Sequence, residues 1–103
     1  MENVFQQVWE ALVNLVDGDM TDADLAAKLD ETAEGRNLNW RASVVDFLAL
    51  VGVDSSSENR EALGFELGVI GTPKTAAFNE ALRRALFAKI ADSGGNVPAS
   101  LLD

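Results

Sequence analysis

The 103-residue chain contains no cysteine and no histidine. Without cysteine there can be no disulfide, and without either residue there is no zinc site of the usual Cys/His kind. Serine hydrolysis through a histidine base is excluded as well, so acid–base catalysis would depend on carboxylates, lysine or arginine. We therefore expect a protein that is not an enzyme and that binds no cofactor and no metal.

Long apolar runs are also missing. No segment approaches the roughly 20 apolar residues that a membrane-spanning helix needs. The N-terminal sequence MENVFQQVWEALVNLV has no basic region before its apolar residues, so it does not resemble a signal peptide. We expect no membrane segment and a cytoplasmic location.

Positive charge is scarce in the first third of the chain. Residues 1–34 hold nine acids and a single base, Lys28, whereas the remainder is nearly neutral and the whole chain carries a net charge of −9. Such an acidic field repels phosphate backbones and anionic lipid headgroups, so neither nucleic acid nor a membrane is an expected partner. The charge serves solubility or forms a docking surface for a basic partner.

Apolar residues make up 48% of the chain and charged residues 24%, values typical of a globular protein. The apolar spacing is helical throughout, and no segment has the pattern of a strand. We predict an all-α fold: a compact bundle of about five short helices in one domain, residues 1–103, with no sheet. The first helix should occupy about residues 3–16, and the last should begin at Thr72-Pro73 and stop at Gly94-Gly95.

Capping patterns predict where the other helices begin and end. Thr21 opens the second helix in a variant capping box, and Ser55 with Glu58 forms a full capping box for the fourth. The third helix should follow Asn39 or Trp40 and should stop at Gly52, while Gly18 should end the first. Gly64 lies inside the fourth helix, where a glycine often marks the close approach of another helix.

The first helix carries an unusually broad apolar arc. Trp9, Val13 and Val16 widen its main apolar face, so this helix is either clamped between other helices or lends a face to a second chain, as in a homodimer. Phe87 falls nearly opposite the main apolar face of the last helix. Trp9, Val13 and Phe87 therefore either form an exposed partner surface or bury one another.

Trp40, Arg41 and Arg60 are further candidate interaction residues, because tryptophan and arginine are enriched at binding hot spots. In the alternative interpretation, Trp40 fills the core and Arg41 pairs with a nearby carboxylate. Asp46 lies within the very apolar third helix and must be paired if it is buried, with Arg41 or Arg60 as its partner.

The acidic segment that begins at Asp17 has some features of a calcium-binding loop. An EF-hand starting there would place Asp22 where glycine is required and Lys28 where glutamate is required. We therefore interpret the segment as a turn between helices followed by a helix cap.

Several short motifs between about residue 22 and residue 103 resemble the small bacterial family known as domain of unknown function 3597. They are Leu38-Asn39-Trp40-Arg41, Ser43-Val44-Val45-Asp46-Phe47-Leu48, Glu66-Leu67-Gly68 and the ending that starts at Gly94-Gly95-Asn96-Val97-Pro98. The resemblance implies a small helical fold and implies no activity. It is incomplete in the last helix, where family members carry an Asn-Ile-Trp-Leu-His-like stretch. The corresponding residues here, Ala77-Phe78-Asn79-Glu80-Ala81-Leu82, include neither tryptophan nor histidine.

Three classes of function fit these observations. The first is a non-catalytic protein-interaction module, which binds another protein or self-associates through the first helix. The alternative is a cell-envelope or peptidoglycan-associated domain, suggested by labels given to some family members, although a chain with two tryptophans and no tyrosine is poorly supplied for glycan binding. A small enzyme based on carboxylates fits least well.

Overall fold

The computed structural model describes residues 3–17, 19–20, 24–72 and 74–102. Within these ranges it contains no strand, and the chain folds into helices packed as one compact globule with a Cα radius of gyration of 12.7 Å. The all-α prediction is therefore confirmed. The elements are α1 (Val4–Val16), α2 (Leu25–Ala33), α3 (Val44–Val51), α4 (Ser57–Leu67), α5 (Ala76–Asp92) and a short 3₁₀ helix, η1 (Ala99–Leu101).

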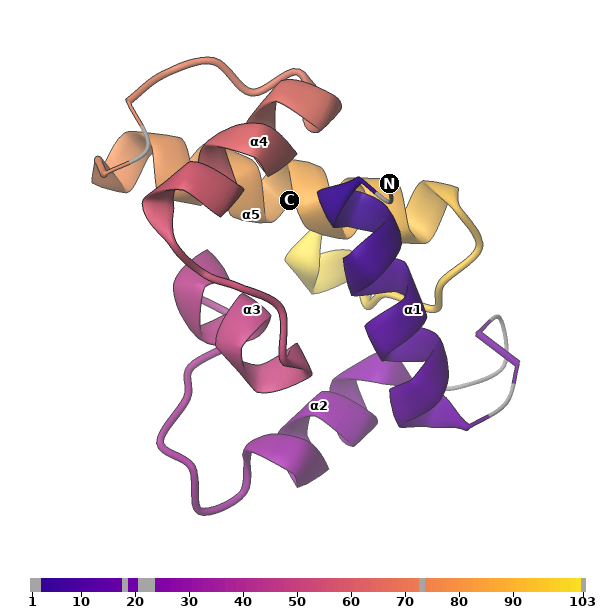
Figure 1. Cartoon of the computed structure of the whole chain (residues 1–103). Helices are drawn as coiled ribbons and strands as arrows, with labels where there is room; N and C mark the ends of the chain where they lie inside the picture. Colours follow the sequence, from indigo (N-terminus) through magenta and orange to yellow (C-terminus); the bar gives the residue numbers. More distant parts are fainter. Residues whose placement is uncertain (1–2, 18, 21–23, 73, 103) are drawn as a thin grey trace.

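The longest helix, α5, runs behind the others, and α4 lies across it at one end of the molecule (Figure 1). The α1 helix packs against α2, α3 and α4, and α3 also contacts α2 and α5. This arrangement clamps α1 between other helices, which is one of the two placements left open by its broad apolar arc. Its fully buried face consists of Val4, Val8, Leu12 and Val16.

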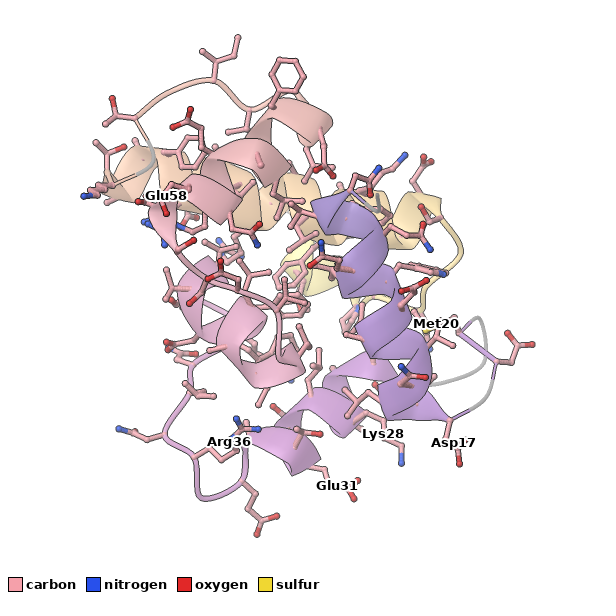
Figure 2. The ribbon with its side chains drawn as sticks, in the orientation of Figure 1. Asp17, Met20, Lys28, Glu31, Arg36 and Glu58 are labelled. Carbon is pink, nitrogen blue, oxygen red and sulfur yellow. The ribbon has the colours of Figure 1, made fainter. Side chains whose placement is uncertain are left out.

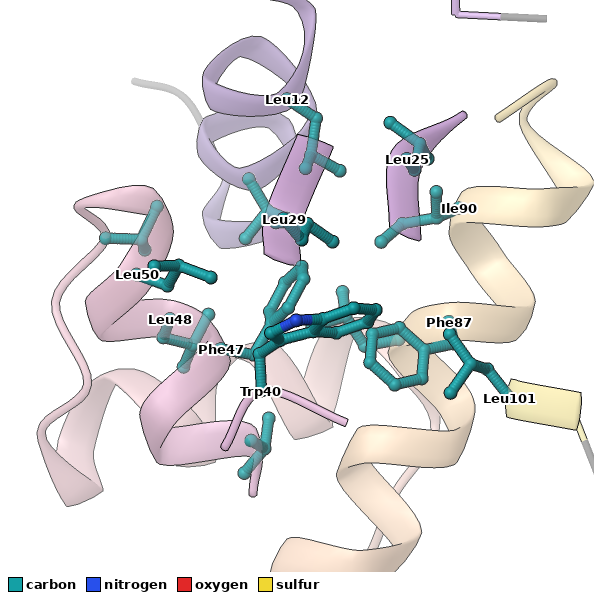
Figure 3. Close-up of a cluster of buried hydrophobic side chains, with 14 of the residues drawn as sticks. Leu12, Leu25, Leu29, Trp40, Phe47, Leu48, Leu50, Phe87, Ile90 and Leu101 are labelled. Atoms are coloured by element: carbon teal, nitrogen blue, oxygen red, sulfur yellow. The ribbon is translucent and has the colours of Figure 1, made fainter. Parts of the chain in front are cut away.

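An aromatic cluster occupies the centre of the core (Figure 3). The ring of Phe87 meets the ring of Trp40 edge to face at a centroid distance of 6.1 Å and that of Phe47 at 5.3 Å. Edge-to-face packing is a favoured geometry for aromatic pairs. The pocket in the core beside this cluster has a volume of about 10 Å³, close to the minimum that one water molecule needs.

The structure corrects several predicted helix starts. The cap of α3 is Ser43 instead of Asn39 or Trp40, and the cap of α5 is Thr75 instead of a residue at Thr72. Thr21 lies outside the described residues, and α2 begins at Leu25 with Asp24 as its cap. The side chains of these caps, Asp24, Ser43 and Thr75, each accept a hydrogen bond from the N–H three residues later. This is the usual geometry of a helix cap.

The predicted capping box at Ser55 is displaced by one residue. The cap of α4 is Ser56, whose hydroxyl accepts from the N–H of Asn59 at 3.3 Å. The carboxylate of Asp54 accepts hydrogen bonds from both the N–H and the hydroxyl of Ser56, each at 3.0 Å. These local hydrogen bonds hold Ser56 at the start of the helix. The spacing of Ser55 and Glu58 in the sequence does not reveal the bonds to Asp54, so it predicted the wrong serine as the cap.

Glycine positions were predicted more accurately. Gly52 and Gly68 end α3 and α4 in the left-handed conformation, with φ of 80° and 78°. At the end of α1 the left-handed residue is Asp17, with φ of 50°, while Gly18 lies outside the described residues. A Cβ atom added to Gly64 would lie 2.8 Å from the ring of Phe78, which confirms the close approach of another helix.

The C-terminal tail folds back onto the core. Leu101 in η1 is buried, and the N–H of Asn96 donates a hydrogen bond to the carbonyl of Met20 at 3.2 Å. Its neighbour Leu102 remains 41% exposed, so the first leucine of the pair packs on the core and the second stays at the surface. In the part of the chain that the structure describes, no helix has the length and apolar character needed to cross a membrane.

Candidate functional site

Two of the aromatic candidates for an interaction surface are part of the core. Trp40 is 2% exposed and Phe87 is 3% exposed, and the two rings contact each other. Trp9 and Val13 are half-buried and pack against the core from α1, where the Trp9 ring lies 6.3 Å from that of Phe5. The structure therefore does not bring Trp9, Val13 and Phe87 together as an exposed apolar surface.

Arg41 lies on the surface and binds Asp30 at the end of α2. Its two terminal nitrogens donate to the two carboxylate oxygens of Asp30 at 2.6 and 3.0 Å, and its guanidinium carbon lies 4.5 Å from the centre of the Trp40 ring. The indole N–H of Trp40 donates to the same carboxylate at 3.0 Å. The predicted pairing of Arg41 with a carboxylate is confirmed, and the arrangement ties α2 to the turn before α3.

The pKa of the Asp30 carboxyl lies below its ordinary value of 3.8. The main cause is the hydrogen bond from Arg41; partial burial opposes it, while the bond from Trp40 and the positive charge of Arg41 lower the pKa further. The low pKa follows from a structural ion pair at the surface, in which both side chains are about half exposed.

Arg60 lies inside the domain, where it is 8% exposed. Its Nε–H donates to the side-chain oxygen of Asn79 at 3.1 Å, and a terminal nitrogen donates to the carbonyl of Ser55. The guanidinium thus joins α5 to the loop before α4. A partner cannot reach a side chain placed in this way, so its role here is structural.

Asp46 is half-buried, and its carboxylate accepts a hydrogen bond from the N–H of Asn39 at 2.9 Å. Among the described residues it forms no ion pair with Arg41 or Arg60, so the predicted pairing is wrong. A single backbone donor satisfies the carboxylate because the turn before α3 passes close to it. The described residues also contain no group of three acidic side chains that could hold a metal ion.

The most exposed apolar side chains of the described structure lie at the end of α4 and in the loop that follows. Phe65 is 89% exposed and Ile70 is 97% exposed. Both line a surface hollow of about 840 Å³, whose apolar wall also includes Ala62, Val69 and Phe78. We call this feature the α4 hollow.

Three glutamates, Glu58, Glu61 and Glu66, also line the α4 hollow, and no basic side chain does. Glu58, Glu61 and Phe65 lie on one exposed face of α4, since residues three, four and seven apart share a helix face. The opposite face carries Leu63 and Gly64, which are buried against the domain. Along the exposed face of α4, the acidic residues Glu58 and Glu61 therefore come first and the apolar Phe65 follows near the C-terminal end of the helix.

The sequence contains a signal for Phe65 that the predictions did not use. A helix advances about 100° per residue, so Phe65 lies about 200° from Leu63 and from Leu67, the two leucines that form the apolar stripe of this helix. An aromatic residue opposite the buried stripe is an exposed one. Ile70 stands between Gly68 and Gly71 in the loop after α4, where helical spacing gives no information about exposure.

Comparison with known families identifies the family of this chain. The model of the family described as domain of unknown function (DUF3597) matches residues 10–98. The chain belongs to this family. The match begins inside α1 and includes all of α2 to α5, so most of the fold described above belongs to the family domain. Neither the curated proteins nor the solved structures contain a match to the chain.

Proposed function

We propose that this domain is a non-catalytic protein-interaction module that binds another protein through the α4 hollow. The observation that carries the proposal is that Phe65 and Ile70 are both strongly exposed and line the same hollow. A monomeric domain gains nothing in stability from such side chains, because they remain in contact with water. Exposed apolar patches with a polar surround are typical of protein-binding sites.

The partner in this proposal is a different protein. Two copies joined through the same hollow would bring their glutamates together, because a two-fold interface uses one surface twice. Each copy also carries a net charge of −9. Association through α1 is the weaker candidate, since its apolar side chains are all buried or half-buried against the domain.

The envelope-associated and enzymatic alternatives have less support. Glycan binding usually depends on several exposed aromatic rings along a groove, whereas Trp40 is buried, Trp9 is half-buried and the α4 hollow carries one exposed ring, that of Phe65. A carboxylate-based enzyme would need two acids that converge in a pocket with perturbed pKa values. The lowered pKa of Asp30 is explained by its ion pair with Arg41 instead.

The test is affinity purification from extracts of the native host with wild-type protein and two variants. The double variant Phe65→Ser/Ile70→Ser removes both exposed apolar side chains, and Leu102→Ser removes a 41%-exposed leucine outside the hollow as a matched control. Circular dichroism checks that both variants are folded, as expected for substitutions at the surface.

We expect at least one protein to be retained by the wild type and by Leu102→Ser and to be lost with the double variant. That protein should then bind the purified domain in a stoichiometric complex. If every retained protein binds the double variant as strongly as the wild type, the α4 hollow is not the docking surface and the proposal is wrong.

A further inference from the structure

The charge of the α4 hollow identifies the chemistry of its partner, an inference that depends on the proposed function. Glu58 and Glu61 lie one turn apart on the exposed face of α4, and Phe65 follows one turn later. Neither glutamate has an ion-pair partner among the described residues. A partner that covers Phe65 and Ile70 along this face also comes close to two carboxylates whose charge is not compensated.

Glu66 contributes differently from the other two glutamates. Its carboxylate oxygens accept hydrogen bonds from the N–H groups of Val4 and Phe5 at the start of α1, each at 2.9 Å. All three glutamates are exposed, but the carboxylate of Glu66 is held by these two backbone donors. The charge available to a partner is therefore concentrated on Glu58 and Glu61.

The fold also limits the backbone conformation of the partner. Peptides that bind as an added strand need the exposed edge of a sheet, and the described residues form no strand. Another common mode places an amphipathic helix in an apolar groove, with anchors at positions i, i+3, i+4 and i+7. A hollow of about 840 Å³ with an apolar wall offers space for several such side chains.

We infer that the α4 hollow binds an amphipathic helix that carries lysine or arginine beside its apolar anchors. The anchors cover Phe65 and Ile70, and the basic side chains lie near Glu58 and Glu61. Charge complementarity of this kind increases the rate of association and discriminates against acidic partners. It also favours a different, basic protein over a second copy of this acidic chain.

The inference is tested with designed 18-residue helical peptides that carry leucine at positions i, i+3, i+4 and i+7, so that the leucines form one apolar face. One peptide carries lysine at the remaining charged positions, a second carries glutamate and a third carries glutamine. Binding is measured by fluorescence anisotropy at 50 and 500 mM NaCl, and the binding site is mapped by amide chemical shifts in NMR spectra of the full chain.

Two charge variants locate the interaction. Glu58→Gln/Glu61→Gln removes the free charge of the hollow. Glu31→Gln/Glu34→Gln is the matched control, because it removes two exposed glutamates from the end of α2 and its C-terminal cap. Glu31 lies at the opposite end of the molecule from Glu58 (Figure 2). Exposed ion pairs contribute little individually, so loss of two pairs weakens binding on the order of fivefold.

We expect the lysine peptide to bind most tightly and to shift the amide signals of Phe65 and Ile70. Its affinity should fall at 500 mM NaCl and in Glu58→Gln/Glu61→Gln and should be unchanged in the control variant. If the glutamine peptide binds the hollow equally well and Glu58→Gln/Glu61→Gln has no effect, the inferred basic partner is wrong while the proposed docking surface stands.

Two other outcomes have different meanings. If the lysine peptide shifts signals of residues 17–34 and the α2 control variant abolishes binding, it is held by the acidic third of the chain, and the inference is overturned. If no peptide shifts the signals of the hollow and no natural partner depends on Phe65 and Ile70, both the inference and the proposed function are wrong.

Discussion

Glu66 on α4 accepts a hydrogen bond from the backbone N–H of Val4 at 2.9 Å, across 62 positions of the sequence. Its other carboxylate oxygen accepts from the next N–H, that of Phe5, and the side chain of Asn3 accepts from the N–H of Gln6 at 2.7 Å. The N–H groups of the first turn of a helix have no partners within the helix. A carboxylate from a distant helix therefore supplies two of the acceptors that α1 needs and also places a negative charge at its positive end.

The variant Glu66→Ala removes both acceptors and leaves two N–H groups without a protein partner. We expect its free energy of unfolding to fall by about 1–2 kcal/mol, because hydrogen bonds to charged groups and helix caps have this magnitude. Urea denaturation followed by circular dichroism measures the change. Glu61→Ala, on the exposed face of the same helix, is the control and should change stability by less than about 0.5 kcal/mol. Equal midpoints for the two variants would show that the Glu66 bonds contribute nothing.

Helical periodicity predicted the fold class well, but it could not predict a contact such as that of Glu66. The buried stripe of α1 and the central position of α3 follow from apolar spacing within each helix, so both are visible in the sequence. The bond from Glu66 to Val4 depends on how α4 lies against α1, and no local pattern contains that angle.

Phe87 shows the same limit within a single helix. It lies nearly opposite the apolar face of α5, a position that left exposure and burial both open, and it is almost fully buried. The reason is tertiary: α5 packs against α4 on one side and α3 on another, so a second face of the helix is covered. Trp40 and Phe47, which cover Phe87, come from parts of the chain that the spacing of α5 does not describe.

The ion pair of Asp30 and Arg41 should make stability depend on pH at the acid end. The pKa of Asp30 is lower in the folded state than its ordinary value of 3.8, so the unfolded chain binds a proton at this site more readily. The contribution of the pair is therefore fully present above about pH 4 and is lost as the pH falls through the folded pKa. Because both side chains are about half exposed, solvent screening keeps this contribution small.

The variant Asp30→Asn removes the charge and should lower stability at pH 7 by no more than about 1 kcal/mol. The difference between wild type and variant should shrink as the pH is lowered from 5 to 2, because the wild-type carboxyl becomes neutral as well. Thermal unfolding at a series of pH values measures this convergence. A difference that stays constant over the whole range would mean that the charge of Asp30 does not matter, and Glu31→Gln serves as the control for the general loss of one negative charge.

Arg60 was a candidate interaction residue because arginine is enriched at binding hot spots, whereas the structure gives it a role inside the domain. A substitution can distinguish these two roles. In Arg60→Lys the positive charge is kept, but an ammonium group cannot reproduce the two directions in which the guanidinium donates to Asn79 and Ser55. We expect a loss of about 1–3 kcal/mol in the free energy of unfolding, measured in urea. The exposed Arg84→Lys is the matched control, with little expected change. If the Arg60→Lys variant is as stable as the wild type but fails to bind the natural partner, Arg60 takes part in binding and its role is not structural.

Gly64 connects the packing of the core with the proposed docking surface. A Cβ atom at this position would lie 2.8 Å from the tip of the Phe78 ring and 3.2 Å from the carbonyl oxygen of Val69, and both of these residues also line the α4 hollow. Alanine is the better helix former by about 1 kcal/mol, so propensity alone predicts that Gly64→Ala is stabilising. Overpacking opposes this gain, because a buried ring and a backbone carbonyl must both move.

We expect overpacking to prevail in Gly64→Ala, with a net loss of about 1–2 kcal/mol measured by urea denaturation. The double variant Gly64→Ala/Phe78→Leu should be more stable than the sum of the two single changes predicts, because the smaller side chain leaves room for the new methyl group. The ring of Phe78 forms part of the wall of the hollow, so the shift in Gly64→Ala should also weaken binding of the lysine peptide without any change in Phe65 or Ile70. A stabilised Gly64→Ala variant would mean that Phe78 moves aside freely, and the glycine would then be no requirement of the packing between α4 and α5.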